Sequence, residues 1–173
     1  NKIKLFIPII SIALFACSST MPKSPKWFLN VPEEEGYLFS VGTEKGDEMQ
    51  NALTEAELIA ATDLQRRLDN IGKGTLDRVN EEINDRAAID NFTDVRNVTY
   101  KVREGGYTLV ERDYTSEGSI IRAYVLIKYD LNAAEKRLLD KIKKNKELND
   151  ALRSSQLYKE MEERVSKAFP DQD

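Results

Sequence analysis

An apolar run near the N-terminus sets the first limit on what this chain can fold into. Residues 5–15 read LFIPIISIALF, follow Lys2 and Lys4, and end two residues before the only cysteine, Cys17. A helix needs about 20 apolar residues to span a membrane, so this run is too short. A basic start followed by a short apolar run is typical of an export signal. We therefore expect residues 1–16 to be a signal peptide.

The four residues that end at this cysteine resemble the lipobox of bacterial lipoproteins. In Leu14-Phe15-Ala16-Cys17 a small residue directly precedes the cysteine, and the resemblance implies that lipid is attached to Cys17. Ser18 follows instead of the aspartate that retains many lipoproteins in the inner membrane, which favours the outer-membrane lipid as partner. The alternative is an incidental cysteine in an ordinary signal peptide. The leaflet, periplasmic or surface-exposed, stays open.

Length and charge limit the rest of the chain to one acidic domain. The sequence has 26 basic and 30 acidic residues and no basic stripe with interleaved aromatics, so it is not expected to bind nucleic acid. The residues after the signal are enough for a single hydrophobic core. We expect a lipidated tether at 17–26, one α+β domain at 27–142 and a C-terminal helical extension at 143–173.

Hydrophobic spacing in the first half of this domain predicts one strand and a long helix. Tyr37–Thr43 alternates apolar residues as a strand does. From about Asp47 to Asn70 the apolar positions recur at helical spacing. Gly72-Lys73-Gly74-Thr75 interrupts this pattern, and glycine costs up to about 1 kcal/mol in a helix interior. The second helical piece, which extends to about Ala87, is therefore either continuous with the first or set off by a kink, and the glycines favour the kink.

Beyond Asn91 the apolar period changes from helical to alternating. The segments Val98–Val102, Tyr107–Tyr114 and Ile120–Tyr129 are separated by glycine-containing turns, which predicts three antiparallel strands. One face of the last strand is expected to carry Ile121, Ala123, Val125, Ile127 and Tyr129. With the first strand these make a small antiparallel sheet of about four strands, packed on the long helix. The residues from Leu131 to Phe169 predict two further helices.

Several short motifs resemble the LPP-twenty lipoprotein family, which includes a flagellar outer-membrane lipoprotein. The motifs are Pro25-Lys26-Trp27-Phe28, Gly36-Tyr37-Leu38-Phe39-Ser40-Val41-Gly42, the helix with Ala52, Ala56, Ala60 and Ala61, the strand Arg122-Ala123-Tyr124-Val125-Leu126, and Leu157-Tyr158-Lys159-Glu160-Met161. The resemblance implies a small α+β domain held at the outer membrane. It implies no catalytic residue.

The residue types exclude the commonest kinds of catalysis. The chain has no histidine, which removes Ser/His/Asp and Cys/His catalysis and His-ligated zinc. Gly72-Lys73 lacks the preceding glycine of a phosphate-binding loop, since Arg67 stands in its place. No carboxylate falls at an apolar position where burial would raise its pKa. We expect no catalytic residue, no metal ligand and no cofactor.

These observations favour a non-enzymatic outer-membrane lipoprotein that is a structural or interaction module of the bacterial envelope. A ring-forming flagellar motor component is the most concrete case, as a homo-oligomer or with an envelope protein partner. The alternatives are a surface-displayed lipoprotein or antigen, and a cell-envelope hydrolase. The residues predicted to contact a partner are Trp27 and Phe28 beside the tether, and Leu157, Tyr158 and Met161 in the C-terminal extension. For Trp27 and Phe28, core packing is the alternative to an exposed docking surface.

Overall fold

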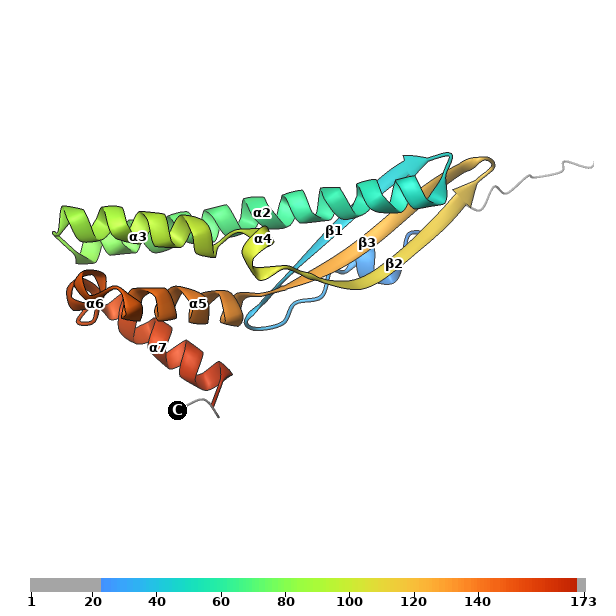
Figure 1. The fold of residues 1–173 in the computed structure, drawn as a ribbon. Coiled ribbons are helices and arrows are strands. Elements are labelled where there is room, and N and C mark those ends of the chain that lie inside the picture. The colour runs from blue at the N-terminus through green and yellow to red at the C-terminus, as the bar shows by residue number, and fades with distance from the viewer. Residues whose placement is uncertain (1–22, 171–173) are drawn as a thin grey trace, which may run out of the picture.

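The computed structural model describes residues 23–170, which form an elongated α+β fold (Figure 1). The strands β1 (Tyr37–Gly46), β2 (Thr108–Glu117) and β3 (Ile120–Asp130) make one antiparallel sheet in the order β1-β3-β2. The helices are α1 (Lys26–Leu29), α2 (Met49–Glu82), α3 (Arg86–Thr99), α4 (Val102–Gly105), α5 (Leu131–Lys144), α6 (Lys146–Leu152) and α7 (Gln156–Ala168). The sheet lies at one end of the molecule and α3, α6 and α7 lie at the other (Figure 1).

Helix α2 joins the two ends and covers one face of the sheet. Its 34 residues make a helix about 51 Å long. Against the sheet it presents small side chains, including the fully buried Ala56 and Ala60. A Cβ atom placed on Gly42 of β1 would overlap the Ala56 carbonyl oxygen. Small residues on both elements therefore allow helix and strand to approach closely, and the Ser40 hydroxyl donates to the Asp63 carboxylate at 3.0 Å across the same interface.

The prediction that residues 72–75 interrupt the long helix is wrong. One helix runs from Met49 to Glu82, and the chain leaves it only before Asp85, whose side chain accepts the backbone N–H groups of Ala87 and Ala88 as the N-cap of α3. Gly72 lies inside α2 where the Tyr100 ring packs, and a Cβ atom there would come within 3.2 Å of that ring. This glycine makes room for a neighbouring side chain, so its cost to the helix is offset by packing.

The sheet has three strands and not four, because Val98–Val102 is not a strand. These residues end α3 and begin α4. Phe92 and Thr99 are buried on one face of α3, and their spacing of seven residues is that of a helix. Three alternating apolar residues at the end of a helix fit the period of a helix as well as that of a strand. The buried Tyr100 packs against α2 rather than against a neighbouring strand.

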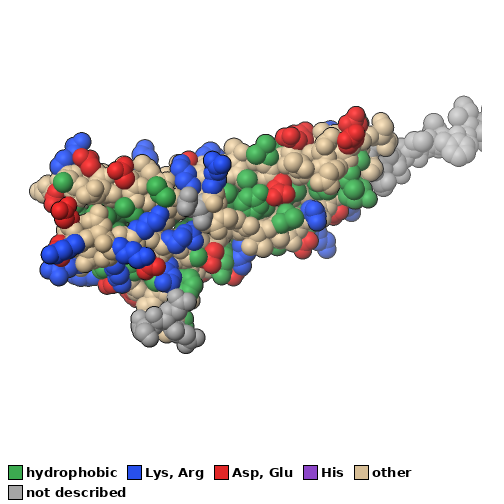
Figure 2. All heavy atoms as spheres, viewed as in Figure 1, with side chains coloured by type: hydrophobic (Ala, Val, Ile, Leu, Met, Phe, Trp, Pro, Cys, Tyr) green, Lys and Arg blue, Asp and Glu red, His purple; other side chains and the backbone are tan. Residues whose placement is uncertain are grey.

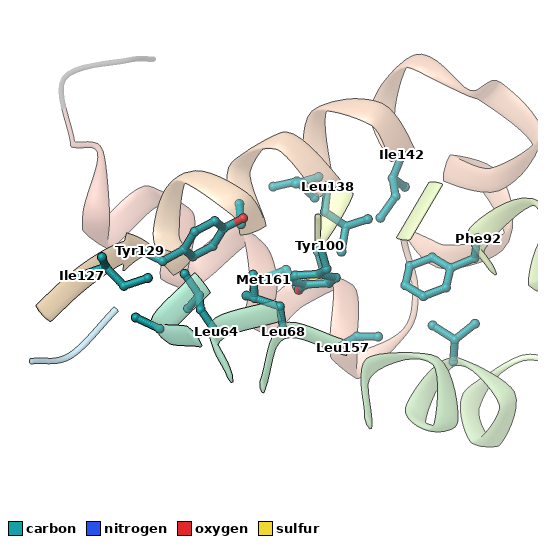
Figure 3. Packing of buried hydrophobic residues seen from close by; sticks show 14 of the residues in the cluster. Leu64, Leu68, Phe92, Tyr100, Ile127, Tyr129, Leu138, Ile142, Leu157 and Met161 are labelled. Carbon is teal, nitrogen blue, oxygen red and sulfur yellow. The ribbon is translucent and has the colours of Figure 1, made fainter. Parts of the chain in front are cut away.

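One face of β3 forms the sheet side of the core, as predicted. Val125 is 1% exposed, and it belongs to the same buried cluster as Ala123, Ile127 and Tyr129. Leu64 and Leu68 of α2 belong to that cluster too. Figure 3 shows how side chains from β3, α2, α3, α5 and α7 meet in it. The core is therefore continuous from the sheet into the helices.

The C-terminal region contains three helices, where two were predicted. Asn145 accepts the N–H of Leu148 and starts α6, and Ser155 accepts the N–H of Tyr158 and starts α7. Both breaks in the apolar period of this region are therefore helix boundaries, each with its own N-cap. The predicted division at residue 142 does not separate two cores, because the buried cluster continues into α6 and α7.

Candidate interaction surface

The outer face of the sheet, opposite α2, is partly covered by the N-terminal segment. The Phe28 ring lies edge-on to the Tyr124 ring of β3 with 4.9 Å between centroids, and Trp27 packs in the same manner on Phe28 at 6.3 Å. The Lys128 ammonium of β3 binds the Glu34 carboxylate at 2.7 Å. Trp27 and Phe28 are both half-buried. Their packing on Tyr124 is that of core side chains, so they offer only part of their surface to a partner.

Strand β2 is the uncovered part of the sheet. Every residue from Thr108 to Tyr114 is exposed, whereas Ala123 to Ile127 of the neighbouring β3 are all buried. Three of the exposed residues are large and apolar: Leu109 is 36% exposed, Val110 41% and Tyr114 51%. Figure 2 shows hydrophobic side chains along this face of the molecule, over the region where α2 and β2 lie in Figure 1. An exposed apolar strip of this kind marks a surface for contact with another molecule.

The strip exists because α2 packs on β1 and β3 and leaves the same face of β2 open. Leu109 is paired with Ile127 and Tyr114 with Ala123, and paired residues of neighbouring strands share a face. Leu109 and Tyr114 therefore point to the side of the sheet on which α2 lies. At one end of this face the Tyr107 hydroxyl donates to the Glu57 carboxylate of α2 at 2.7 Å. That hydrogen bond raises the pKa of Tyr107 to about 12.

The two edges of the sheet differ in which side chains hydrogen-bond to their outward-pointing backbone groups. At the β1 edge the Arg67 guanidinium of α2 donates to the Phe39 carbonyl. At the β2 edge the Asp113 carboxylate accepts the N–H of the adjacent Tyr114 at 2.8 Å. Since N–H groups two residues apart along a strand point to the same side, those of Arg112 and Ser116 also point to this free edge. Within residues 23–170, the β2 edge is therefore contacted by the Asp113 side chain of β2 itself, whereas the β1 edge is contacted by the Arg67 side chain of helix α2.

The outer face of β2 carries two negative charges. Glu111 is paired with Leu126 and Asp113 with Tyr124, so both carboxylates lie on the side away from α2. Within residues 23–170 no ion pair includes either of them. Arg112 is paired with Val125, so it lies between Leu109 and Tyr114 on the side that faces α2. Strand β2 thus presents one side with exposed apolar residues around an arginine and one acidic side, joined by its free backbone edge.

A second concave surface lies between α7 and the start of α5. This cleft has a volume of about 540 Å³. Its charges are largely paired with one another: Arg164 donates twice to Glu135, at 2.9 and 2.5 Å, and Arg78 binds Glu160 at 2.8 Å. The Arg78 pair keeps the pKa of Glu160 below its usual range. Such pairing holds α7 against α5 and α2 and leaves few charges for a ligand.

Buried Tyr100 lines the same cleft but has the properties of a structural residue. Burial, followed by the charge of Glu135, raises its pKa to about 12. A phenol with such a pKa stays protonated at neutral pH and cannot act as a general base there. The cleft therefore has the geometry of a helix junction stabilised by ion pairs.

The structure separates the residues predicted as sites into three groups. Cys17 lies outside the described residues. Trp27 and Phe28 lie together on the outer face of the sheet. Leu157, Tyr158 and Met161 are buried at 4, 6 and 1% exposure, so in the folded chain they are not surface residues for a partner. Helix α7 directs them inward because it packs on α5 and closes the helical end of the core.

Sequence reasoning missed the open side of β2. The strand itself was predicted, but nothing in its alternation shows whether α2 lies over it. The signal that was available is the run Glu111-Arg112-Asp113 beside Leu109 and Val110. A strand with charges on both faces is typical of a sheet edge.

Comparisons with known proteins identify no relative of this chain. No family model, no curated protein and no solved structure matches it. None of the helices in the described part of the chain has the length and apolar composition required to cross a bilayer. Across residues 23–170, His, Cys, Asp and Glu side chains form no group of three or more that could hold a metal ion.

Proposed function

We propose that this protein is a lipid-anchored interaction module of the bacterial outer membrane that binds another envelope protein and catalyses no reaction. The observation that carries the proposal is strand β2, whose free edge pairs with no other strand among residues 23–170 and which exposes Leu109 and Tyr114 on one side and two carboxylates on the other. An enzyme site requires reactive groups with matched pKa values around a bound substrate. The concave surface between α5 and α7 instead contains arginine and glutamate side chains that pair with one another.

The anchoring part of the proposal rests on the lipobox-like residues that end at Cys17. Several acyl chains on one cysteine each contribute about 0.8 kcal/mol per buried CH₂ group, which is enough for stable membrane attachment. The tether before Lys23 would then hold the sheet end near the membrane, since Ser24 contacts Tyr124 on the sheet. Helices α3 and α6 would extend away from the anchor.

Fractionation of cells that express Cys17→Ser tests the anchor. We expect the wild type to need detergent for release from outer-membrane fractions and the variant to be released by buffer alone. Cys17→Ala serves as a second removal of the thiol. If the variants stay in the membrane after a salt wash, lipid on Cys17 is not what holds the protein there.

Cross-linking in cells tests the interaction. We expect the wild type to be captured with another envelope protein. A ladder of cross-linked copies would instead identify the ring-forming, flagellar version of this function. A chain that is recovered only as a monomer under all conditions would contradict an interaction role.

A further inference from the structure

We propose that β2 is the docking strand for an extended segment of another protein, which adds to the sheet as a fourth strand. The segment alternates apolar residues, which pack beside Leu109 and Tyr114, with lysine or arginine, which faces Glu111 and Asp113. This inference rests on the proposed interaction function and specifies its site and the chemistry of its partner. The charges on β2 favour a segment of a different protein over a second copy of this chain.

The free edge of β2 has backbone N–H groups that can pair with an added strand. The N–H groups of Arg112, Tyr114 and Ser116 point to the free edge, and among the side chains of residues 23–170 only that of Asp113 accepts one of them, the N–H of Tyr114. An added strand supplies carbonyl groups for all three, which is the main source of affinity when a peptide extends a sheet. Asp113 would release the Tyr114 N–H and become available to a cation on the incoming strand.

The side chains of β2 define what the segment carries. On the α2 side, Leu109 and Tyr114 leave apolar area exposed on either side of Arg112, and alternate apolar residues of a neighbouring strand would cover this area and the methylene groups of the arginine. On the other side, Glu111 and Asp113 are two residues apart and therefore neighbours on one face. Opposite charges across two strands stabilise their pairing and like charges oppose it. An extended segment with apolar and basic residues in alternation satisfies both faces.

A second copy of β2 is a poor occupant of the same edge. Paired residues of an antiparallel sheet share a face, so a symmetric pair of β2 strands must place one residue opposite itself. A centre at Arg112 or at Asp113 places two like charges directly opposite. Each of these registers is destabilised by charge repulsion.

Strand β1 of a neighbouring copy is blocked for a different reason. The Arg67 guanidinium of α2 donates to the Phe39 carbonyl at that edge, so pairing with β1 would require this contact between helix and sheet to break. The Glu44 carboxylate accepts the N–H of Lys45 at 2.8 Å, as Asp113 does for Tyr114 in β2, so that contact does not distinguish the two edges. The observations therefore favour a strand from a different protein.

Peptide binding to the full-length lipidated chain in detergent tests the proposal. The probe is a fluorescent peptide of about nine residues that alternates valine with lysine. We expect it to bind and to slow the hydrogen exchange of the Arg112, Tyr114 and Ser116 amides. A matched peptide that alternates valine with glutamate should bind about tenfold more weakly, because attractive pairs become repulsive ones. A third peptide, with the same valines and lysines in two separate blocks, controls for attraction by net charge alone.

Two variants of β2 test whether the peptide binds to this strand. Glu111→Lys together with Asp113→Lys should reverse the preference, so that the glutamate peptide binds more tightly than the lysine peptide. Arg112→Pro removes an N–H group at the free edge and leaves the β3 side of the strand unchanged. It should abolish binding without changing the urea midpoint by much.

Three results would overturn the proposal. One is that the peptide with separate valine and lysine blocks binds as tightly as the alternating lysine peptide, or that the alternating peptide binds the Arg112→Pro variant as tightly as the wild type. Another is no binding by any of the peptides. The third is protection of the β2 edge amides that appears on raising the protein concentration alone, which would show that a second copy occupies the edge. None of these bears on membrane anchoring, because fractionation of the Cys17 variants reports on the anchor separately.

Discussion

Single residues with small side chains set the distance between α2 and the sheet. Gly42 of β1 faces the Ala56 carbonyl and the Ala60 amide of α2 so closely that no Cβ atom fits between them. The sequence places Gly42 inside the predicted strand Tyr37–Thr43. Its role depends on what lies across from it, and this cannot be predicted from the local pattern.

Gly42→Ala should destabilise the protein by about 3 kcal/mol or more, because the added methyl group forces α2 away from the sheet. Gly74→Ala is the matched control, since a Cβ atom at that position of the same helix meets no atom within 4 Å. The control should be stabilised by up to about 1 kcal/mol. Urea unfolding of both variants measures the two effects, and equal stability of Gly42→Ala and the wild type would contradict the close approach.

Tyr107 should make stability depend on pH in the alkaline range. Its hydrogen bond to Glu57, and then burial, raise its pKa to about 12 from 10.0. A raised pKa of an acid stabilises the folded state fully below the unfolded value, and the contribution is lost as the pH rises from about 10 through about 12. Between about pH 8 and about pH 11, the wild type should therefore lose more stability than Tyr107→Phe. An equal loss in both proteins would show that this hydrogen bond is not formed.

At the scale of the element, period alone predicted which face of a strand is buried but not how many strands there are. Ile120 to Tyr129 has enough alternating residues to define its inward face, and the structure confirms it. Val98–Val102 is too short to distinguish a strand from the last turn of a helix. The long helix was predicted as two pieces because the pattern shows the intrinsic cost of glycine and not the ring of Tyr100 that Gly72 accommodates.

The inward face of β3 predicts opposite outcomes for two similar substitutions. Val125→Asp places a carboxylate in the core, where no partner is available, and should cost several kcal/mol. Val110→Asp, on the exposed β2, should change stability by less than about 0.5 kcal/mol. Thermal unfolding followed by circular dichroism compares them. A cooperatively folding Val125→Asp variant with wild-type stability would mean that this face is not buried.

At the scale of the whole molecule, the C-terminal helices belong to the same core as the sheet. A separate extension was predicted because one small sheet does not need that many helices to cover it. The structure uses them differently: α7 packs on α5 and on the part of α2 that extends beyond the sheet, and α6 packs on α3 and α5. Neither the length of α2 nor its extension past the sheet follows from composition, so this arrangement could not be predicted.

Ending the chain after Asn149 should therefore prevent folding and not only weaken association. The truncation removes the buried side chains of Leu152, Leu157, Tyr158 and Met161, and each large buried side chain contributes about 1.5–3 kcal/mol. A chain that ends after Pro170 is the control and should fold normally. Near-ultraviolet circular dichroism and urea titration distinguish the two chains. A cooperative transition in the shorter chain would support the prediction that the C-terminal residues form a separate extension.

Helix α2 also determines how the protein unfolds. Its first half supplies one wall of the sheet's core and its second half supplies one wall of the helical core, so the two ends share a single rod of backbone hydrogen bonds. Neither end can lose its packing without exposing apolar residues on a helix that the other end still requires. We therefore expect one all-or-none transition, in which fluorescence from Trp27 at the sheet end and hydrogen exchange around Phe92 at the helical end report the same free energy of unfolding. Despite its elongated shape, the molecule then behaves as one cooperative unit, so a disturbance of the core under the sheet is felt at α6.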